Sequence, residues 1–246
     1  MLSIIIITKN EEEYLPRLLE SIKYQDYKDY EVILSDAQST DNTRQIAIES
    51  GCRIIEGGLP SVGRNNGAKV AKGNTILFLD SDVVLPKKFL RTNLEEFKKK
   101  GVVTATPIYK PITDKNIDKF LYKVYNTWAK ATQYFYPHSA GFCIFCKKDT
   151  FNKLKGFDEK ILMAEDHDFV NRSKKHGKFR ILYNKPILVD IRRLDEEGRF
   201  ELVKKYFKGA IHRTFKGEIY TPNFEYKLHG GVEITKVAKE LEAKYK

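Results

Sequence analysis

The sequence has few cysteines and no long hydrophobic run. Its three cysteines, Cys52, Cys143 and Cys146, cannot all pair, and the C-x-x-C spacing of the last two lies in an apolar stretch without a second ligand pair. We therefore expect buried free thiols rather than a zinc or redox centre. The longest apolar runs are about half a dozen residues, far below the ~20 that a membrane-spanning helix needs. No basic segment with a cleavage site precedes the first strand-like residues, so we expect no signal peptide and a cytoplasmic location.

Internal repeats, linkers and low-complexity tracts are also missing, which predicts one continuous domain over residues 1–246. Acidic residues are fewer than basic ones, 33 against 44, and the net charge is +11. This surplus favours anionic partners such as nucleotides, phospholipid head groups or nucleic acid. The basic residues are spread along the chain and no nucleic-acid-binding motif occurs, so we expect no nucleic-acid partner.

Short apolar runs alternate with helical patterns over residues 1–105. Strands are predicted at residues 2–8, 30–35, 53–55, 75–79 and 102–106, and helices at 15–22, 41–50, 64–71 and 86–99. This alternation is typical of parallel βαβ units, an α/β fold with a mostly parallel sheet. The second half is less regular, with strands predicted at 141–146, 179–183 and 187–191 and a helix at 165–176.

Two further segments show apolar residues at helical spacing. The first consists of Ile117, Phe120, Leu121, Val124, Tyr125, Trp128 and Phe135. We interpret it as a core-facing stripe; the alternative is that its aromatic residues also wall an acceptor site. The second, at 199–216, places apolar residues opposite Lys and Arg, within a basic amphipathic helical tail at 191–246. Two interpretations stay open for it: packing on the core or a partner subunit, or lying in the interface of a membrane.

Carboxylates directly follow two of the predicted strands. Asp80 and Asp82 come after the apolar run 75–79, and Asp36 ends the run 30–35. Open α/β sheets bind ligands at the carboxyl ends of their strands, so these residues are expected to share one pocket. Asp80 and Asp82 repel each other unless a cation lies between them. Mg²⁺ and Mn²⁺ prefer oxygen ligands and commonly bridge a protein carboxylate to a diphosphate, which predicts a metal site here.

Five segments in order now resemble the family 2 glycosyltransferases, which have the GT-A fold. They are Ile7-Thr8-Lys9-Asn10-Glu11, residues 35–43 (SDAQSTDNT), residues 63–68 (GRNNGA), Phe78-Leu79-Asp80-Ser81-Asp82 and residues 164–169 (AEDHDF). The resemblance spans residues 2–183. It implies a mixed, largely parallel sheet with helices on both faces, a half at 1–105 that binds a nucleotide-diphosphate sugar, and an acceptor and catalytic half at 106–190.

The resemblance also implies roles for single residues. Thr8 and Glu11 would lie near the base and ribose, Asp36 would bind a uracil-type base edge, and Arg64 would contact the nucleotide or its phosphates. Asp80 would lie near the ribose, and Asp82, with Asp80 beside it, would hold Mn²⁺ or Mg²⁺ on the diphosphate. The donor is expected to be a UDP-sugar, and the acceptor a sugar or a polyprenyl lipid, reached in the cytoplasm or at the inner face of the membrane. Arg192 and Arg193 lie where other members place basic phosphate contacts.

The Glu-Asp motif supplies the candidate base. By resemblance, Asp166 would take a proton from the acceptor hydroxyl, which then attacks the anomeric carbon with inversion. Glu165 and Asp168 remain alternatives, because neighbouring residues on a helix point ~100° apart. His138 and His167 are expected to be structural or near the acceptor. The chain lacks the Gln-x-x-Arg-Trp motif of processive synthases, so polymer synthesis is not expected.

Other functions fit the sequence less well. A nucleotidyltransferase would carry a glycine-rich phosphate loop after the first strand, and residues 8–12 contain no glycine. A sugar-nucleotide-binding protein without activity remains the non-enzymatic alternative, although its metal and base positions would all be filled.

Overall fold

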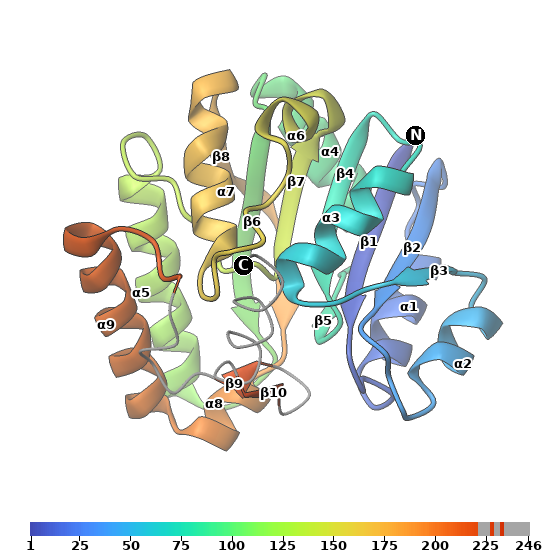
Figure 1. Cartoon of the computed structure of the whole chain (residues 1–246), viewed down its shortest axis with the longest axis horizontal. Helices are drawn as coiled ribbons and strands as arrows, with labels where there is room; N and C mark the ends of the chain where they lie inside the picture. Colours follow the sequence, from blue (N-terminus) through green and yellow to red (C-terminus); the bar gives the residue numbers. More distant parts are fainter. Residues whose placement is uncertain (221–226, 229–231, 234–246) are drawn as a thin grey trace, which may run out of the picture.

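A computed structural model describes residues 1–220, 227–228 and 232–233. Its centre is an eight-stranded sheet of order β3-β2-β1-β4-β7-β6-β8-β5. Helices cover both faces of this sheet (Figure 1). The strands are β1 (Leu2–Thr8), β2 (Tyr30–Asp36), β3 (Arg53–Glu56), β4 (Thr75–Asp80), β5 (Val83–Val84), β6 (Thr104–Pro111), β7 (Cys143–Lys147) and β8 (Phe179–Val189). A separate pair joins β9 (Lys227–Leu228) to β10 (Val232–Glu233).

The helices follow the strands in the alternation that the sequence predicts. They are α1 (Leu15–Lys23), α2 (Thr43–Glu49), α3 (Pro60–Val70), α4 (Phe89–Lys99), α5 (Asn116–Thr132), α6 (Lys148–Leu154), α7 (Glu165–Ser173), the 3₁₀ turn η1 (Lys174–His176), α8 (Arg192–Glu197) and α9 (Arg199–Lys216). Strands β3, β2, β1 and β4 are parallel to one another, whereas β7 runs antiparallel to both β4 and β6. The predicted mixed, mostly parallel α/β sheet is therefore confirmed.

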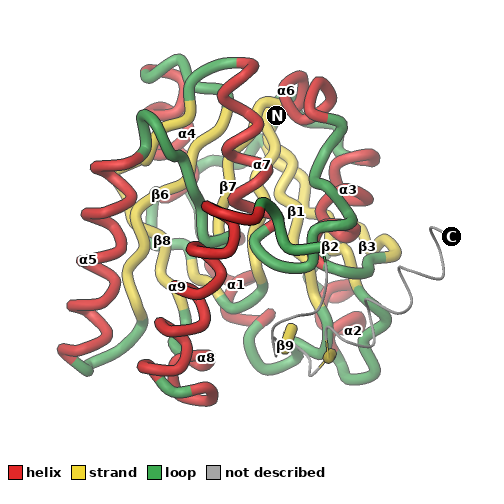
Figure 2. Tube along the Cα trace, turned by 60° about the vertical axis from the view of Figure 1, so that its left-hand side comes forward, coloured by secondary structure: helices red, strands yellow, loops and turns green. Residues whose placement is uncertain are grey.

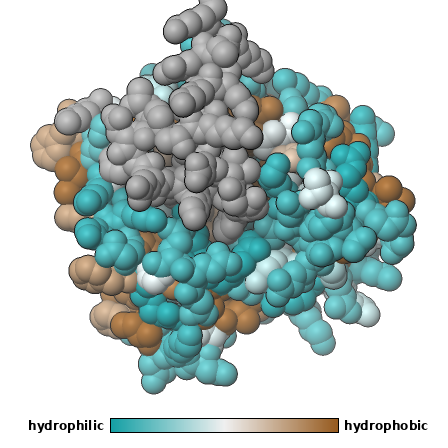
Figure 3. Space-filling view, turned by 60° about the horizontal axis from the view of Figure 1, so that its bottom comes forward, coloured by the Kyte–Doolittle hydropathy of each residue, from teal (hydrophilic) through white to brown (hydrophobic). Residues whose placement is uncertain are grey.

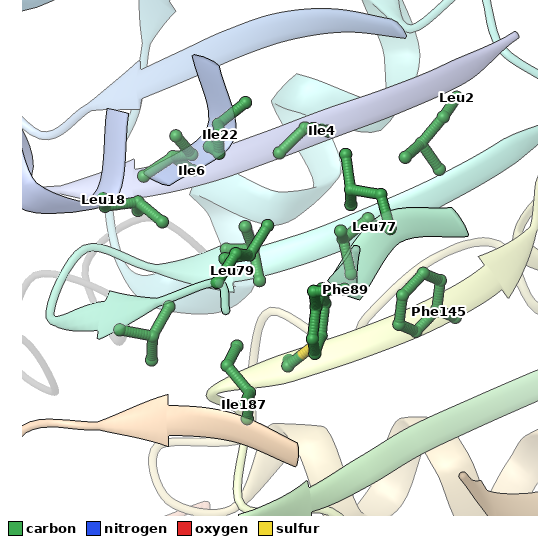
Figure 4. Close-up of a cluster of buried hydrophobic side chains, with 14 of the residues drawn as sticks. Leu2, Ile4, Ile6, Leu18, Ile22, Leu77, Leu79, Phe89, Phe145 and Ile187 are labelled. Carbon is green, nitrogen blue, oxygen red and sulfur yellow. The ribbon is translucent and has the colours of Figure 1, made fainter. Parts of the chain in front are cut away.

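Strand β1 shows why the apolar runs are continuous. Ile4 and Ile6 point into one core cluster together with side chains of α1 and α4, a region drawn in Figure 4. Ile5 points into a second cluster with Phe78 and Phe169, beneath α3 and α7. Successive residues of a strand face opposite sides, so a strand buried on both faces is apolar at every position.

Strand β8 differs from the prediction. The sequence indicated two strands at 179–183 and 187–191, but the chain forms one strand with a register shift opposite Pro107 and Tyr109. Pro186 lies in this irregular part, where its missing N–H costs no ladder bond. The carboxylate of Glu96 accepts hydrogen bonds there from the backbone N–H groups of Tyr183 (3.0 Å) and Asn184 (3.0 Å).

Helix boundaries differ by a few residues from the predictions. Helix α3 begins at Pro60 rather than Arg64, because proline suits the first helical position, where no N–H is needed. Helix α4 begins at Phe89, three residues after the predicted start, and α7 ends at Ser173 before the 3₁₀ turn. Helix α8 lies within the predicted helical tail at 191–246, in which only the segment at 199–216 was predicted with bounds of its own.

The stripe on α5 corrects the expectation of a core-facing surface. Ile117, Phe120, Val124, Trp128 and, after the helix, Phe135 are exposed, and only Leu121 and Tyr125 are half-buried. The buried positions of α5 are Asp118 and Ala129. Hydrophobic periodicity detects an apolar face but not whether another element covers it.

Helix α9 gives a similar result. Within the predicted tail at 191–246, α8 and α9 are helical as expected, whereas residues 221–226, 229–231 and 234–246 lie outside the described residues. Leu202 is buried, but Val203, Phe207, Ile211 and Phe215 of the predicted stripe are exposed. Packing on the core is therefore wrong for most of this stripe. Helices α5 and α9 lie side by side in both views (Figures 1 and 2). No helix in the described part of the chain is long and apolar enough to cross a membrane.

Candidate active site

Three of the predicted site residues end neighbouring strands. Thr8 ends β1, Asp36 ends β2 and Asp80 ends β4, and β1 pairs with the other two strands in parallel. Thr8 is the register partner of Asp36, and Ile7 is the partner of Asp80. The carboxylates at the strand ends therefore lie along one edge of the sheet, where α/β folds bind their ligands.

Asp36 is fully buried and holds the turn that follows β2. It accepts hydrogen bonds from the hydroxyl of Thr8 (3.2 Å), the backbone N–H of Ser39 (3.0 Å) and the guanidinium of Arg44 (3.1 Å). Asn10 lies beside this turn and accepts the backbone N–H of Thr40 at 2.8 Å. The loops after β1 and β2 are thus tied together, and a contact between Asp36 and a base stays a prediction.

Arg64 joins the two halves of the chain. It is buried on α3 and donates through Nη2 to Asp80 (2.9 Å) and through Nη1 to Glu165 (2.6 Å), the first residue of α7. Burial opposes its charge, but Asp80 and Glu165 outweigh burial and raise the pKa of Arg64. The predicted donor residue Arg64 therefore also orders the predicted acceptor half.

Asp166 lies next to this pair and is buried. Its Oδ1 accepts the backbone N–H of His167 at 2.8 Å. Burial, followed by the charge of Glu165, raises the pKa of Asp166 to about 8, against the opposing effect of Arg64. A carboxyl group with such a pKa can accept a proton near neutral pH, which an ordinary aspartate does poorly.

The other two acidic candidates for the base are engaged in ion pairs. Glu165 is paired with Arg64, and Asp168 accepts Nε of Arg172 at 2.7 Å. Burial raises the pKa of Asp168 as well, although Arg172 opposes the rise. A carboxylate oxygen that already accepts a hydrogen bond from a guanidinium is less available to an acceptor hydroxyl. Among the three acidic residues of this motif, Asp166 suits proton transfer best.

Asp82 follows β4 in the turn that leads to β5. It is buried, and burial together with the charge of Asp80 raises its pKa to about 7, while Arg192 opposes the rise. Nη2 of Arg192 lies 3.6 Å from Oδ2 of Asp82 and 3.0 Å from Oε1 of Glu11. Arg192 also stacks on Tyr14, with its Cζ atom 4.0 Å from the ring centroid.

The carboxylates of Asp80 and Asp82 fit a hard divalent cation. Asp80 and Asp82 supply carboxylate oxygens, and a cation beside them would offset the burial and the charge of Asp80 that raise the pKa of Asp82. Within the described residues, no group of three or more His, Cys, Asp and Glu side chains could hold a metal by itself. Asp80 and Asp82 could therefore supply only part of the coordination shell of such a cation.

His138 and His167 stack with their ring centroids 5.7 Å apart. Burial lowers the pKa of His138 to about 4 and lowers the pKa of His167 as well. Both imidazoles are therefore neutral at pH 7. Trp128 lies against His138 with a centroid distance of 3.8 Å, so an aromatic stack leads from α5 to the residue beside Asp166.

Two residues of this region were not predicted as part of the site. Gly141, assigned from the sequence to a strand, has φ +76° and lies against Asp166 and Arg64. Tyr14 contacts Arg192 but looks in the sequence like an ordinary residue at the start of a helix. Gly141 could have been identified because it is a glycine, the residue that a positive φ favours. No sequence signal identifies Tyr14.

Known proteins share this fold. The mannosyltransferase PcManGT from Pyrobaculum calidifontis, solved with GDP-Man and Mn²⁺, superposes with a TM-score of 0.72 over 90% of this chain and 66% of its own, at 17% identity. Residues 1–349 of Staphylococcus aureus TarS, solved with UDP, superpose with a TM-score of 0.64 over 87% of this chain and 72% of that one, at 20% identity. The fold is thus that of the GT-A glycosyltransferases, as predicted.

The family follows from the sequence comparison. The model of glycosyl transferase family 2 matches residues 3–152, and the chain belongs to this family. Glycosyltransferase GlyG from Streptococcus pneumoniae is 27% identical over 154 residues, which cover 58% of this chain and 46% of GlyG. The chain therefore matches less than half the length of this relative.

Proposed function

We propose that this chain transfers a sugar from a nucleotide-diphosphate sugar to an acceptor hydroxyl or a lipid-linked phosphate, with inversion at the anomeric carbon. The observation that carries the proposal is the arrangement around Arg64. Its guanidinium binds Asp80 at the end of β4 (2.9 Å) and Glu165 at the start of α7 (2.6 Å). A donor held at the strand ends would thus lie beside the carboxyl group of Asp166.

The donor is proposed to lie along the edge formed by β2, β1 and β4. Thr8 and Glu11 would adjoin the base and ribose, Asp36 would accept a base N–H, and Asp80 would lie near the ribose. Arg64 is proposed to serve this donor mainly by fixing Asp80, because both of its terminal nitrogens already bind carboxylates. The UDP bound to TarS supports a uridine donor, and the GDP-Man bound to PcManGT keeps guanosine as the alternative.

A divalent cation, Mn²⁺ or Mg²⁺, is proposed to be held by Asp82, with Asp80 beside it. The Mn²⁺ in the PcManGT structure supports the choice of ion. Such a cation neutralises the charge that develops on the departing diphosphate. Arg192, 3.6 Å from Asp82, is placed to add a second positive charge at this end of the site.

Asp166 is proposed as the general base. Its carboxylate would take the proton from the acceptor hydroxyl while the hydroxyl oxygen attacks the anomeric carbon. A single displacement of this kind needs no nucleophile from the enzyme and inverts the configuration. When the acceptor is a phosphate that is already ionised, no proton has to move, and loss of Asp166 would have a small effect.

Donor turnover with and without Mn²⁺ tests this function. Release of nucleoside diphosphate from a panel of UDP- and GDP-sugars, measured with and without EDTA, is expected only with the metal present. Thermal stabilisation by one donor without turnover on any sugar or polyprenyl acceptor would instead indicate a sugar-nucleotide-binding protein.

A further inference from the structure

Two neighbouring helices expose large apolar side chains in rows. On α5, the exposed row consists of Ile117, Phe120, Val124 and Trp128. On α9, it consists of Phe200, Val203, Phe207, Ile211 and Phe215. These nine side chains, which we call the apolar face, are between 43% and 82% exposed. Soluble proteins expose single apolar residues commonly, but not contiguous rows on adjacent helices.

Each row lies on one side of its helix. At 100° per residue, Phe200, Val203, Phe207 and Ile211 fall within a sector about 80° wide, opposite the buried positions Leu202 and Gly209. The α5 row follows the same spacing and lies away from the buried Asp118 and Ala129. Both rows therefore arise from helices whose inner faces are already packed.

The two helices are fixed to each other at their first turns. Arg199 of α9 donates through Nη2 to Oδ2 of Asp118 on α5 at 2.9 Å. Figure 2 draws the helices next to each other, and Figure 3 shows hydrophobic surface at the left edge, the side on which Figure 1 draws α5 and α9. The apolar face is thus carried by a pair of helices rather than by one isolated helix.

Basic residues border the apolar face on both helices. Helix α5 carries Lys119, Lys123 and Lys130, all exposed, and its one acidic residue, Asp118, is buried against Arg199. Together with Lys110 of β6, these lysines line a cavity of about 340 Å³ between α5, β6 and β8. None of the described residues that line this cavity is acidic. On α9, the exposed Lys204 and Lys208 flank the apolar row.

We propose that the apolar face docks on an anionic lipid bilayer, with its aromatic side chains in the interface and the lysines of α5 on the lipid head-group phosphates. An apolar, aromatic-rich row bordered by lysines is the pattern of helices that lie in a bilayer interface. Each lysine near an anionic leaflet adds electrostatic attraction. A second copy of this chain is the weaker choice, because the same lysines would face each other across a symmetric contact.

The apolar face is linked to the region of the candidate base, Asp166, by a series of ring contacts. Trp128 belongs to the apolar face and lies against His138, whose ring stacks on His167 beside Asp166. Trp128 and the two imidazoles therefore connect the apolar face to the residue that follows the candidate base. The docking itself does not depend on the proposed transfer reaction, and it is measured without a donor.

Vesicle flotation of the full chain tests the proposal. The protein is mixed with phosphatidylcholine vesicles that contain or lack phosphatidylglycerol, at low and high salt. Binding is expected to the anionic vesicles and to weaken with salt. Phe207→Ser is expected to lower the partition coefficient by about tenfold or more, because the bilayer interface would no longer bury a phenylalanine side chain. The matched control is Tyr24→Ser, which removes an equally exposed aromatic residue from the end of α1.

A second pair of variants tests the lysines. Lys119→Gln with Lys123→Gln is expected to lower binding to anionic vesicles several-fold, whereas Lys98→Gln with Lys99→Gln, the same charge change on the exposed end of α4, is not. Light scattering reports the oligomeric state in parallel. The proposal is overturned if the wild type stays unbound at low salt, if Phe207→Ser and Tyr24→Ser bind alike, or if Phe207→Ser only splits a dimer that never floats.

Discussion

Gly141 lies directly against Asp166. A β-carbon added at Gly141 would be 2.8 Å from Oδ2 of Asp166 and 3.2 Å from Nη2 of Arg64. Real β-carbons do not approach a neighbour as closely as 2.8 Å, so any larger residue would displace the carboxyl group or the loop. The backbone at this position, with φ +76°, also favours glycine. Gly141 therefore sets the place of the candidate base without taking part in the chemistry.

Gly141→Ala is expected to lower turnover at least tenfold and to destabilise the fold by about 1–2 kcal/mol, the cost of a left-handed alanine. Gly51→Ala is the matched control, because Gly51 has φ +75° and no atom within 4 Å of its would-be β-carbon. Both variants should lose similar stability in thermal unfolding, and only Gly141→Ala should lose activity. Equal activities would mean that the contact with Asp166 has no functional consequence.

The positions of the residues that end strands β2 and β4 could be predicted from the sequence. The apolar run 75–79 predicted a buried strand, and the rule that parallel strands share a carboxyl edge brought Asp36 and Asp80 to one place. These are local patterns whose consequences follow from sheet geometry. The corresponding strands β2 and β4 do flank β1, and the residues that end them lie on one edge.

Contacts between distant segments could not be predicted in the same way. Arg64 binds Glu165, which lies 101 residues further along the chain, and no local pattern encodes that pairing. The apolar row on α5 has a similar origin: its spacing predicted one apolar side, but its exposure depends on which elements pack nearby. Strand β8 continues through the gap between the strands predicted at 179–183 and 187–191, because a register shift against β6 keeps it in the sheet.

Asp166→Asn is expected to reduce turnover on a hydroxyl acceptor by about 10²-fold or more, the size of a general-base contribution. Donor affinity, measured by calorimetry, should stay nearly unchanged. Asp168→Asn is the comparison, since Asp168 is held by Arg172 at 2.7 Å on the same helix. A matching loss of donor affinity in Asp166→Asn would assign Asp166 to donor binding instead.

The pH dependence of the reaction should report Asp166. Burial raises its pKa to about 8, so only about a tenth of the carboxyl groups are ionised at pH 7. A general base must be deprotonated, and kcat/KM for a hydroxyl acceptor is therefore expected to rise with pH up to about 8 and then level off. Saturating Mn²⁺ keeps Asp82 deprotonated, so that Asp82 adds no second inflection to the pH profile of kcat/KM. A profile that is flat between pH 6 and 9 would contradict the assignment.

The carboxylate of Asp82 should govern metal binding. Asp82→Ala is expected to abolish Mn²⁺-dependent donor binding and to lower turnover by at least about 10²-fold, because the cation would keep only Asp80 as a protein ligand. Asp149→Ala is the control, since Asp149 is an exposed carboxylate on α6 that pairs only with Lys153 in the described contacts. The fold of Asp82→Ala should persist, because the substitution removes a buried carboxylate whose ionisation is disfavoured.

Metal affinity should also depend on pH in the direction set by Asp82. Burial and the charge of Asp80 raise its pKa to about 7, and a cation binds only the deprotonated carboxylate. Below pH 7, the Mn²⁺ concentration for half-maximal activity is therefore expected to rise about tenfold per pH unit, and above pH 7 it should become constant. Titration of Mn²⁺ at several pH values measures this, with the acceptor saturating. A half-maximal concentration that does not change between pH 5.5 and 8, or full turnover in EDTA, would remove the metal from Asp82.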